Sequence, residues 1–467
     1  MLKTFKIGGI HPDDNKLSAG SSIQELAIPA EVKVPLAQHI GAPAQPVVAV
    51  GDEVKIGQLI AKAGGFVSAN VHSPVSGKVK KIEDFVDGNG YKKQAIVIGV
   101  EGNVWDESVD CTPGIVREIK LAPADIIKKI GEMGLVGMGG ATFPTHVKLS
   151  IPPGKKCDAL IINGVECEPY LTSDHRLMLE KGEEVLIGVK ILMTALGVDK
   201  AFIGIENNKR DAIDHLSKLA AGYPGVTVQP LKLRYPQGGE KQLIDACMGR
   251  QVPSGKLPID VGAVVQNVGT AYAVYEAVQK NKPLIERIVC VTGKPLQKPS
   301  NFLVRIGTPI SALIDAAGGL PEDCGKVIGG GPMMGRAFTN LDVPVIKGTS
   351  GILLMSIAES KRGKTVNCIR CAKCVSVCPM GLEPYLLAKL STKGMWDAAE
   401  PNRIMDCIEC GSCNFTCPSY RPLLDYIRLG KNKVGGILRA RAAEAKAAAE
   451  KAAAEKAAAE KAAAEKK

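Results

Sequence analysis

The sequence predicts a chain of several domains, with an α/β domain between two β-rich modules and a small cysteine-rich domain near the C-terminus. Its 467 residues are too many for one ordinary domain, and an apolar fraction of 45% can build several cores. Apolar runs typical of buried strands alternate with helical patterns between about residues 121 and 278. Farther on, one cysteine spacing occurs twice, 39 residues apart, ahead of an Ala/Glu/Lys tail.

The N-terminal part, which we take as residues 1–110, has the pattern of a small β domain. Two strand–turn–strand patterns, Val50–Ile60 and Ser73–Ile82, resemble the flattened barrel-sandwich of lipoyl and biotinyl carrier domains. Those carriers modify a lysine in the hairpin between the two patterns. Here the connecting stretch Gly64–His72 contains no lysine, so we expect a structural module and not a carrier.

The next domain, residues 120–280, has the alternating pattern of an α/β fold. Ala159–Asn163 and Ala201–Ile205 are apolar runs typical of buried strands. Glu183–Leu196 and Arg210–Ala221 have the spacing of helices. This alternation predicts a mainly parallel, Rossmann-like sheet.

A small β-rich domain follows over residues 282–355. Short strand-like runs alternate there with turns and glycines, among them Gly329–Met334. One helix is expected near Ile310–Ala317. Aromatic residues make up only 4% of the chain, so Val, Ile, Leu and Ala must provide most of the packing.

The cysteine-rich domain, residues 356–430, contains two runs of the form C-x2-C-x2-C-x3-C-P, which is typical of bacterial [4Fe–4S] ferredoxins. The three closely spaced cysteines of a run can surround one face of a cubane, and in two-cluster ferredoxins the fourth ligand comes from the other run. We therefore expect cluster 1 on Cys368, Cys371, Cys374 and Cys417, and cluster 2 on Cys407, Cys410, Cys413 and Cys378. Zinc is the alternative, although zinc sites usually pair two Cys-x-x-Cys hooks over a longer gap. A short apolar helix after each run, beginning at Pro384 and Pro422, is expected to cover the clusters.

Charge and hydropathy limit the classes of partner. The net charge is +11, and the tail, residues 431–467, contributes ten Lys/Arg and five Glu, which leaves +6 for the rest. No basic stripe is interleaved with aromatic residues, so we expect no nucleic-acid partner.

No apolar run reaches transmembrane length, and Met1–Lys6 lacks the apolar core of a secretion signal. The Ala/Glu/Lys repeat predicts a helical spacer with no continuous apolar face, because its period of five does not match 3.6.

Four segments of the α/β domain carry residues suited to binding a nucleotide. The first, Gly134–Lys148, is rich in glycines that let backbone N–H groups approach an anion, and it ends on a lysine suited to a phosphate. The alternative for this loop is a flexible turn. The second, Asn163–Pro169, follows a predicted strand, and its two glutamates can accept from flavin or ribose groups or else cap a helix. The others are Tyr235–Glu240 and Gln266–Thr270.

In this order the four segments resemble the FMN- and NADH-binding subunit of respiratory complex I and related hydrogenase subunits. With Gly8–Pro12 and the doubled cysteine run, the resemblance is closer to the C-subunit family of Rnf electron-transport complexes, over about residues 1–430. It implies that residues 282–355 form a soluble-ligand-binding β-grasp module. It implies FMN at Gly137, Gly139, Gly140, Lys148, Asn163, Glu166, Gly238, Asn267 and Thr270. It implies NAD(H) at Phe143, Glu168 and Glu240.

The sequence also departs from the complex I pattern. Met138, Val165 and Gly239 stand where that pattern has an arginine, an aspartate and a glutamate, so this pocket has less charge. Complex I carries one cluster motif of another spacing, whereas this chain has two ferredoxin-type runs. The contacts to FMN agree with the pattern better than the contacts to NAD do.

The resemblance implies reversible electron transfer between NAD(H), FMN and two [4Fe–4S] clusters, with no side chain acting as a general base. Its partners would be the other subunits of an Rnf membrane complex, including an iron–sulfur subunit. The chain would then lie peripherally at the cytoplasmic face of the cell membrane, with ion movement coupled by the membrane subunits. Two alternatives stay open: a flavoprotein subunit of a soluble NADH dehydrogenase or bifurcating hydrogenase, and a non-enzymatic iron–sulfur relay.

Overall fold

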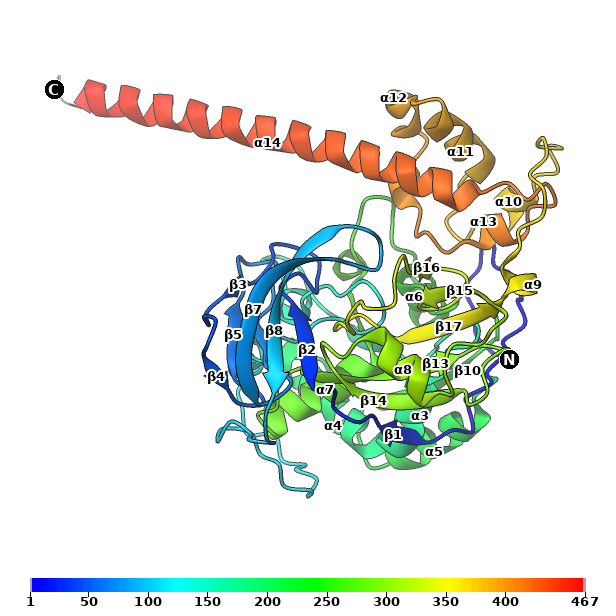
Figure 1. Cartoon of the computed structure of the whole chain (residues 1–467). Helices are drawn as coiled ribbons and strands as arrows, with labels where there is room; N and C mark the ends of the chain where they lie inside the picture. The colour runs from blue at the N-terminus through cyan, green and yellow to red at the C-terminus, as the bar shows by residue number, and fades with distance from the viewer. Residues whose placement is uncertain (1, 465–467) are drawn as a thin grey trace. The chain divides into compact units, whose positions relative to one another are not determined.

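The computed structural model describes residues 2–464, and the chain divides into two compact units, Met1–Arg362 and Gly363–Lys467. The first unit contains a barrel, a parallel α/β module and a β-rich module (Figure 1). The second contains both cysteine runs and a long helix.

The barrel is formed by two small antiparallel sheets with the strand orders β2–β8–β7–β4 and β3–β5–β6. Its strands are β2 (Glu31–Pro35), β3 (Gln45–Pro46), β4 (Glu53–Val54), β5 (Leu59–Lys62), β6 (Val71–His72), β7 (Gly77–Val86) and β8 (Lys92–Val100). Val32, Val34, Ile96 and Ile98 are fully buried between the sheets, because alternate residues of a strand point to the same side. This module agrees with the β domain that the sequence predicts.

The α/β module is built on a fully parallel sheet with the strand order β11–β10–β9–β12. Its strands are β9 (Ala159–Asn163), β10 (Ala201–Glu206), β11 (Val226–Leu231) and β12 (Ala263–Asn267). Both predicted strands are present, and β10 is one residue longer than expected. Asn163 and Asn267 are opposite each other in the register, so β9 and β12 end at the same edge of the sheet.

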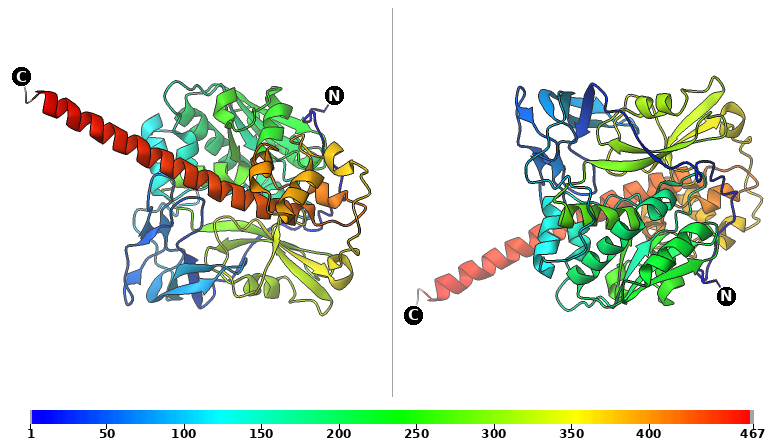
Figure 2. Two further views of the ribbon diagram at one scale, coloured as in Figure 1. Left: turned by 90° about the horizontal axis from the view of Figure 1, so that it is seen from above. Right: turned by 90° about the horizontal axis from the view of Figure 1, so that it is seen from below.

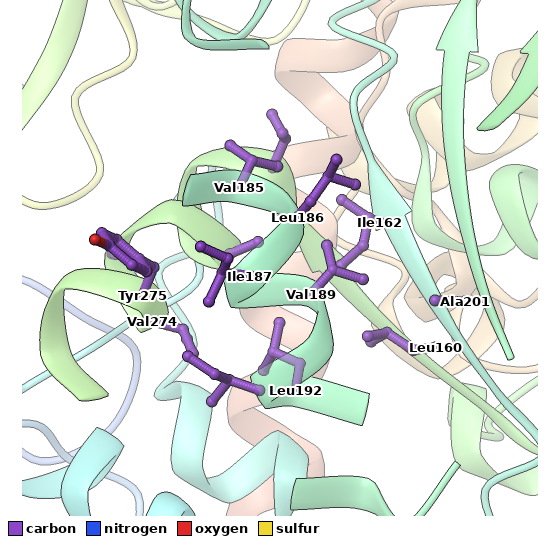
Figure 3. Packing of buried hydrophobic residues seen from close by; sticks show 14 of the residues in the cluster. Leu160, Ile162, Val185, Leu186, Ile187, Val189, Leu192, Ala201, Val274 and Tyr275 are labelled. Atoms are coloured by element: carbon purple, nitrogen blue, oxygen red, sulfur yellow. The ribbon is translucent and has the colours of Figure 1, made fainter. Parts of the chain in front are cut away.

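Helices cover both faces of this sheet, as a parallel sheet requires. They are α1 (Pro123–Glu132), α2 (Thr145–Leu149), α3 (Ser173–Glu180), α4 (Gly182–Leu196), α5 (Arg210–Ala220), α6 (Glu240–Met248) and α7 (Val268–Gln279), with a 3₁₀ turn at Pro258–Val261. Leu160 and Ile162 face the side on which α4 and α7 pack together (Figure 3). Ile161 and Val265 face the other side and pack against α6. Helices α4 and α5 correspond to the two helices predicted from the sequence.

The β-rich module has a mixed sheet with the order β1–β14–β13–β17–β15–β16. Its strands are β1 (Ile23–Glu25), β13 (Glu286–Thr292), β14 (Ser300–Arg305), β15 (Cys324–Gly329), β16 (Arg336–Ala337) and β17 (Gly351–Ser356), and its helices are α8 (Ile310–Ala316) and α9 (Ile357–Ser360). The expected helix is therefore present as α8. Leu313 and Ile314 on that helix are buried against Val289, Val304 and Ile352 from the sheet.

The N-terminal segment, residues 2–25, is not part of the barrel. Strand β1 pairs in parallel with β14, and isolated bridges join Lys3 to Leu231 and Ile10 to Tyr235. Figure 2 shows this dark-blue segment running between the α/β module and the β-rich module. The segment therefore joins two modules that both lie later in the sequence.

The second unit consists of helices around the cysteine runs. They are α10 (Lys373–Ser376), α11 (Pro384–Thr392), α12 (Trp396–Ala399), α13 (Ser412–Phe415) and α14 (Leu423–Ala464), with a 3₁₀ turn at Ile404–Asp406. The helix expected after Pro422 is not short, because it continues into the Ala/Glu/Lys tail as one helix of 42 residues. Gly430, Gly435 and Gly436 weaken the helix where the two parts meet, but no proline follows Pro422 and the alanine-rich tail favours helix. No helix within residues 2–464 is long and apolar enough to cross a membrane.

Candidate cofactor sites

Most of the predicted nucleotide-binding residues meet at the carboxyl edge of β9 and β12. Asn163 donates from Nδ2 to the carbonyl of Gly238 at 2.8 Å, and Asn267 donates to the carbonyl of Asn163 at 3.4 Å. Gly139 lies against the side chain of Asn267, since a Cβ at this glycine would come within 3.3 Å of it. All four nucleotide-binding segments, which are far apart in the sequence, are thereby joined at one edge of the sheet, where parallel α/β folds bind ligands.

Buried side chains fix the conformation of the glycine-rich loop, residues 134–148. The N–H of Gly137 donates to the carbonyl of Phe143 at 2.8 Å, which closes the loop. The N–H of Met138 donates to Oγ1 of Thr270 at 2.9 Å, and Thr270 is completely buried. The guanidinium of Arg287, on β13, donates to the carbonyl of Met138 at 3.5 Å. The β-rich module therefore helps to fix the loop, which the sequence motif alone could not reveal.

The tip of the loop offers free donors. Gly139 and Gly140 are exposed, and the φ of Gly140 is +125°, a conformation that favours glycine. A Cβ at Gly140 would meet no atom within 4 Å. Within residues 2–464, the backbone N–H groups of Gly139, Gly140 and Ala141 donate to no other group. These donors fit the phosphate of a mononucleotide such as FMN.

Lys148 and Glu240 were predicted for different ligands, but they form an ion pair. Their Nζ and Oε1 atoms are 2.7 Å apart, and Lys148 also donates to the carbonyl of Val265 at 3.1 Å. Glu240 is the first residue of α6 and directly follows Gly238 and Gly239. The pair therefore brings the lysine of the glycine-rich segment to the third nucleotide-binding segment.

Glu166 has the alternative role that its sequence context allowed, the capping of a helix. Its carboxylate accepts from the N–H of Asp174 at 2.8 Å and of His175 at 3.1 Å, in the first turn of α3. The hydroxyl of Ser173 donates to it as well, at 3.2 Å. Both carboxylate oxygens are thus engaged at the helix N-terminus, where negative charge is stabilising. Asp174, whose N–H Glu166 accepts, is itself bonded to Asn267 at 2.7 Å, and a contact of Glu166 with FMN stays a prediction.

Glu168 is directed toward the β-rich module. Its carboxylate accepts from the backbone N–H groups of Met333 at 3.2 Å and Met334 at 2.7 Å. Burial raises the pKa of this carboxyl to about 7, against the stabilising effect of the two N–H groups. Tyr235, which begins the third nucleotide-binding segment, donates to Glu168 at 3.5 Å.

Several residues that support the site belong to none of the four nucleotide-binding segments. Nζ of Lys16 donates to the carbonyls of Glu166, Glu168 and Leu171 at 2.7–2.9 Å, and so holds their loop. Asp174 accepts from Asn267 at 2.7 Å, and burial together with the nearby Glu166 raises the pKa of Asp174 well above its ordinary value. These residues lie outside the glycine-rich and strand-end motifs, so a single sequence gave no signal for them.

Gln266 begins the fourth nucleotide-binding segment, but the sequence assigned no ligand to it. It lies beside Asn267 in β12, is 2% exposed, and neither polar atom of its side-chain amide has a partner within the described residues. An unpartnered buried amide is costly, so its position at the carboxyl edge fits a polar ligand there.

The cysteines gather in two sets that cross between the runs. Cys378 from the first run lines one cavity together with Cys407, Cys410 and Cys413 from the second. Leu387 of α11 and Leu424 and Ile427 of α14 line the same cavity, so both helices cover it. Burial raises the pKa of Cys374, and the neighbouring thiols that raise it further are Cys417, Cys368 and Cys371. These groupings correspond to the sets expected for cluster 2 and cluster 1.

A zinc ion needs its ligands around one point, whereas the irons of a cubane are held by separate thiolates. The crossing of the two sets between the runs is the arrangement expected of two cubanes.

Four known domain families match successive parts of the chain, in the same order as the four modules of the structure. The RnfC barrel sandwich hybrid domain matches residues 3–103, and the Nuo51 FMN-binding domain matches residues 130–276. The SLBB domain matches residues 288–337, and a 4Fe-4S dicluster domain matches residues 367–420.

Similar proteins cover almost the whole chain. The C subunit of the proton-translocating ferredoxin:NAD(+) oxidoreductase complex of Clostridium ljungdahlii is 49% identical, over 93% of this chain and 94% of that protein. The C subunit of the Na(+)-translocating ferredoxin:NAD(+) oxidoreductase complex of Acetobacterium woodii is 46% identical, over 92% and 97%. The C subunit of the ion-translocating oxidoreductase complex of Rhodobacter capsulatus is 42% identical, over 93% and 84%.

Proposed function

The chain belongs to the C-subunit family of ion-translocating ferredoxin:NAD(+) oxidoreductase (Rnf) complexes, and from this membership we propose that it passes electrons between NAD(H), FMN and two [4Fe–4S] clusters. The proposal rests on two features that occur in the same chain. The N–H groups of Gly139, Gly140 and Ala141 are free to bind a phosphate, and the cysteines form two crossed sets. Bound FMN would supply the exchange between two-electron transfer with NAD(H) and one-electron transfer with the clusters.

The side chains of the α/β module would bind and orient the cofactor. The N–H groups of Gly139 and Gly140 would hold the phosphate, with Lys148 as its counter-charge. Thr270 and Arg287 would keep the loop in the binding conformation through Met138. Asn163, Gly238 and Asn267 would line the rest of the FMN site at the edge of what we take as a Rossmann-like sheet, and Phe143, Glu168 and Glu240 would meet NAD(H).

The two cysteine sets would hold the clusters, with Cys417 completing cluster 1 and Cys378 completing cluster 2. We place the chain peripherally at the cytoplasmic face of the membrane, held by the other subunits of the complex. In this proposal the FMN and NAD(H) domain spans residues 120–280, the β-grasp domain 282–355, the cluster domain 356–430 and the helical tail 431–467. They follow an N-terminal domain, residues 1–110, whose barrel begins at β2.

The test is flavin and iron analysis of the purified full chain, with NADH-dependent bleaching followed in the same sample. We expect one FMN and about eight irons per chain, and bleaching by NADH. Lys148→Ala should lose FMN and bleaching. The matched control is Lys155→Ala, because Lys155 is also ion-paired at 2.7 Å, to Asp260. Bound FMN and iron without any oxidation of NADH would favour the non-enzymatic relay, and equal effects of the two lysine variants would contradict the placing of the phosphate.

A further inference from the structure

The loop between β9 and α3 has an unusual backbone conformation. Residues 165–172, which we call the 165–172 loop, include no glycine, yet Glu166 has a φ of +44° and Tyr170 a φ of +71°. A positive φ is unfavourable for residues with a side chain and persists only where the surrounding structure fixes it. The loop also carries Glu168, which we place at the NAD(H) site. Its strained conformation therefore needs a restraint from outside the loop.

Lys16 supplies this restraint. A lysine ammonium has three N–H donors, and Nζ of Lys16 donates to three carbonyls of the loop, those of Glu166 at 2.8 Å, Glu168 at 2.9 Å and Leu171 at 2.7 Å. The loop is thus folded around one positive charge. All three acceptors are main-chain oxygens, so this contact fixes the path of the loop and not one particular side chain.

Residues on both sides of Lys16 bind the same loop. The N–H of Tyr170 donates to the carbonyl of Asp14 at 2.8 Å. The hydroxyl oxygens of Ser18 and Thr172 are 2.6 Å apart, and both residues are buried. The segment 14–18 therefore runs along the end of the loop, which fixes the main chain from which Lys16 extends.

The loop in turn reaches two other parts of the site. The carboxylate of Glu168 accepts from the N–H groups of Met333 and Met334 in the β-rich module, and the N–H of Gly238 donates to Sγ of Cys167 at 3.4 Å. Gly238 belongs to the third nucleotide-binding segment. A shift of the loop would therefore move Glu168 relative to that segment.

We propose that Lys16 is a positioning residue of the NAD(H) site, which holds Glu168 in the orientation that binds the nucleotide. This inference rests on the proposed function, because it takes Glu168 as a contact of NAD(H). Lys16 would touch no nucleotide itself, since the loop already uses its three donors. A loop that is ordered before the nucleotide arrives loses less conformational entropy on binding, so the restraint raises affinity. FMN should be affected much less, because we place its phosphate at Gly139 and Gly140.

The experiment measures oxidation of NADH with ferricyanide by the full chain, with FMN and clusters loaded. The test variant is Lys16→Met, whose side chain is long but donates no hydrogen bond. We expect its KM for NADH to rise about tenfold and its kcat to change by about twofold or less, with FMN content unchanged. Lys16→Arg keeps the charge and N–H donors, although its planar fork cannot match all three acceptors, so its KM should return to within about threefold of the unaltered chain.

The matched control is Lys280→Met. Nζ of Lys280 also has three acceptors, Oδ2 of Asp110 and the carbonyl and hydroxyl of Thr112, at 2.9–3.1 Å, but this lysine lies at the end of α7 away from Asn267. The control should lower Tm and leave the KM for NADH within about twofold of the unaltered chain. An equal rise in KM in both methionine variants, or a Lys16→Met variant that loses kcat with KM unchanged, would overturn the proposal.

Amide hydrogen exchange gives a second readout that does not depend on the nucleotide. In Lys16→Met the amides of Tyr170, Met333 and Met334 should exchange about tenfold faster, whereas in Lys280→Met they should not. Unchanged exchange at these amides would contradict the restraint by Lys16. If the unaltered chain oxidises no NADH, the proposed function fails and takes the NAD(H) role of Lys16 with it, whereas faster exchange in Lys16→Met alone would still show that this lysine holds the loop.

Discussion

Replacement of Thr270 by valine tests whether the glycine-rich loop is held by a single buried hydroxyl. Valine has nearly the shape of threonine but cannot accept the N–H of Met138, which donates to Oγ1 at 2.9 Å. A buried donor without a partner costs about 1–3 kcal/mol. For a domain of this size that corresponds to a decrease in Tm of about 2–12 °C. Because the same loop would hold the FMN phosphate, we expect the Kd for FMN to rise about tenfold, or about 1.4 kcal/mol.

The structure provides a matched control in Thr292, which is also completely buried but whose hydroxyl has no partner among the described residues. Thr292→Val should not lower Tm and should raise it by a few degrees, because it removes an unpartnered buried hydroxyl and no hydrogen bond. Thr270→Ser, which keeps the hydroxyl, should restore FMN binding. Scanning calorimetry and titration of the apoprotein with FMN measure both quantities. If the two valine variants lose equal stability and bind FMN equally, the hydroxyl does not hold the loop.

Three further predictions concern the clusters, a buried lysine and a helix cap. Cys417→Ala should remove the EPR signal of cluster 1 and Cys378→Ala that of cluster 2, and the opposite pattern would refute the crossed assignment. Burial lowers the pKa of Lys347 to about 7 from its ordinary value near 10.5, so between these values the unfolded chain binds more protons than the folded one. The free energy of unfolding should therefore rise with pH in this window, by up to about 1.4 kcal/mol per pH unit from this group. Lys347→Met should reduce that slope in denaturation measured from pH 7 to 9.5, and an unchanged slope would contradict the burial of this amine. Glu166→Gln should destabilise the chain by about 1 kcal/mol through the N-terminus of α3, whereas Glu118→Gln, at a side chain 76% exposed, should not.

Local signals predicted much of the fold. The apolar runs at Ala159–Asn163 and Ala201–Ile205 are long enough, and flanked clearly enough by helical patterns, to identify strands β9 and β10. The cysteine spacing predicted the crossed sets because each run alone supplies only three convergent thiols. Helix α14 was predicted as two pieces, since a change in composition at the tail looked like a boundary although nothing there stops a helix.

Long-range contacts explain what the sequence could not reveal about the site. Glu166 was expected to line the FMN site, but its nearest donors are the N–H groups at the start of α3. Lys148 and Glu240 were assigned to separate ligands because they are 92 residues apart in the sequence, yet they pair in space. Arg287 belongs to a different module from the loop that it supports. In each case the partner is chosen by tertiary packing, which leaves no local pattern.

The N-terminal segment has a consequence for how the chain is made. The amide of Asn301 donates to the carbonyl of Ser18 at 3.0 Å, and these residues are 283 positions apart. Strand β1 likewise has no partner until β14 has been synthesised. During vectorial synthesis β1 must therefore wait for the β-rich module, whereas Lys3, Ile10 and Lys16 can pair with the α/β module as soon as it has emerged. The carboxylate of Glu168 accepts from Met333 and Met334, so the last contacts of the 165–172 loop form only after the β-rich module has been synthesised.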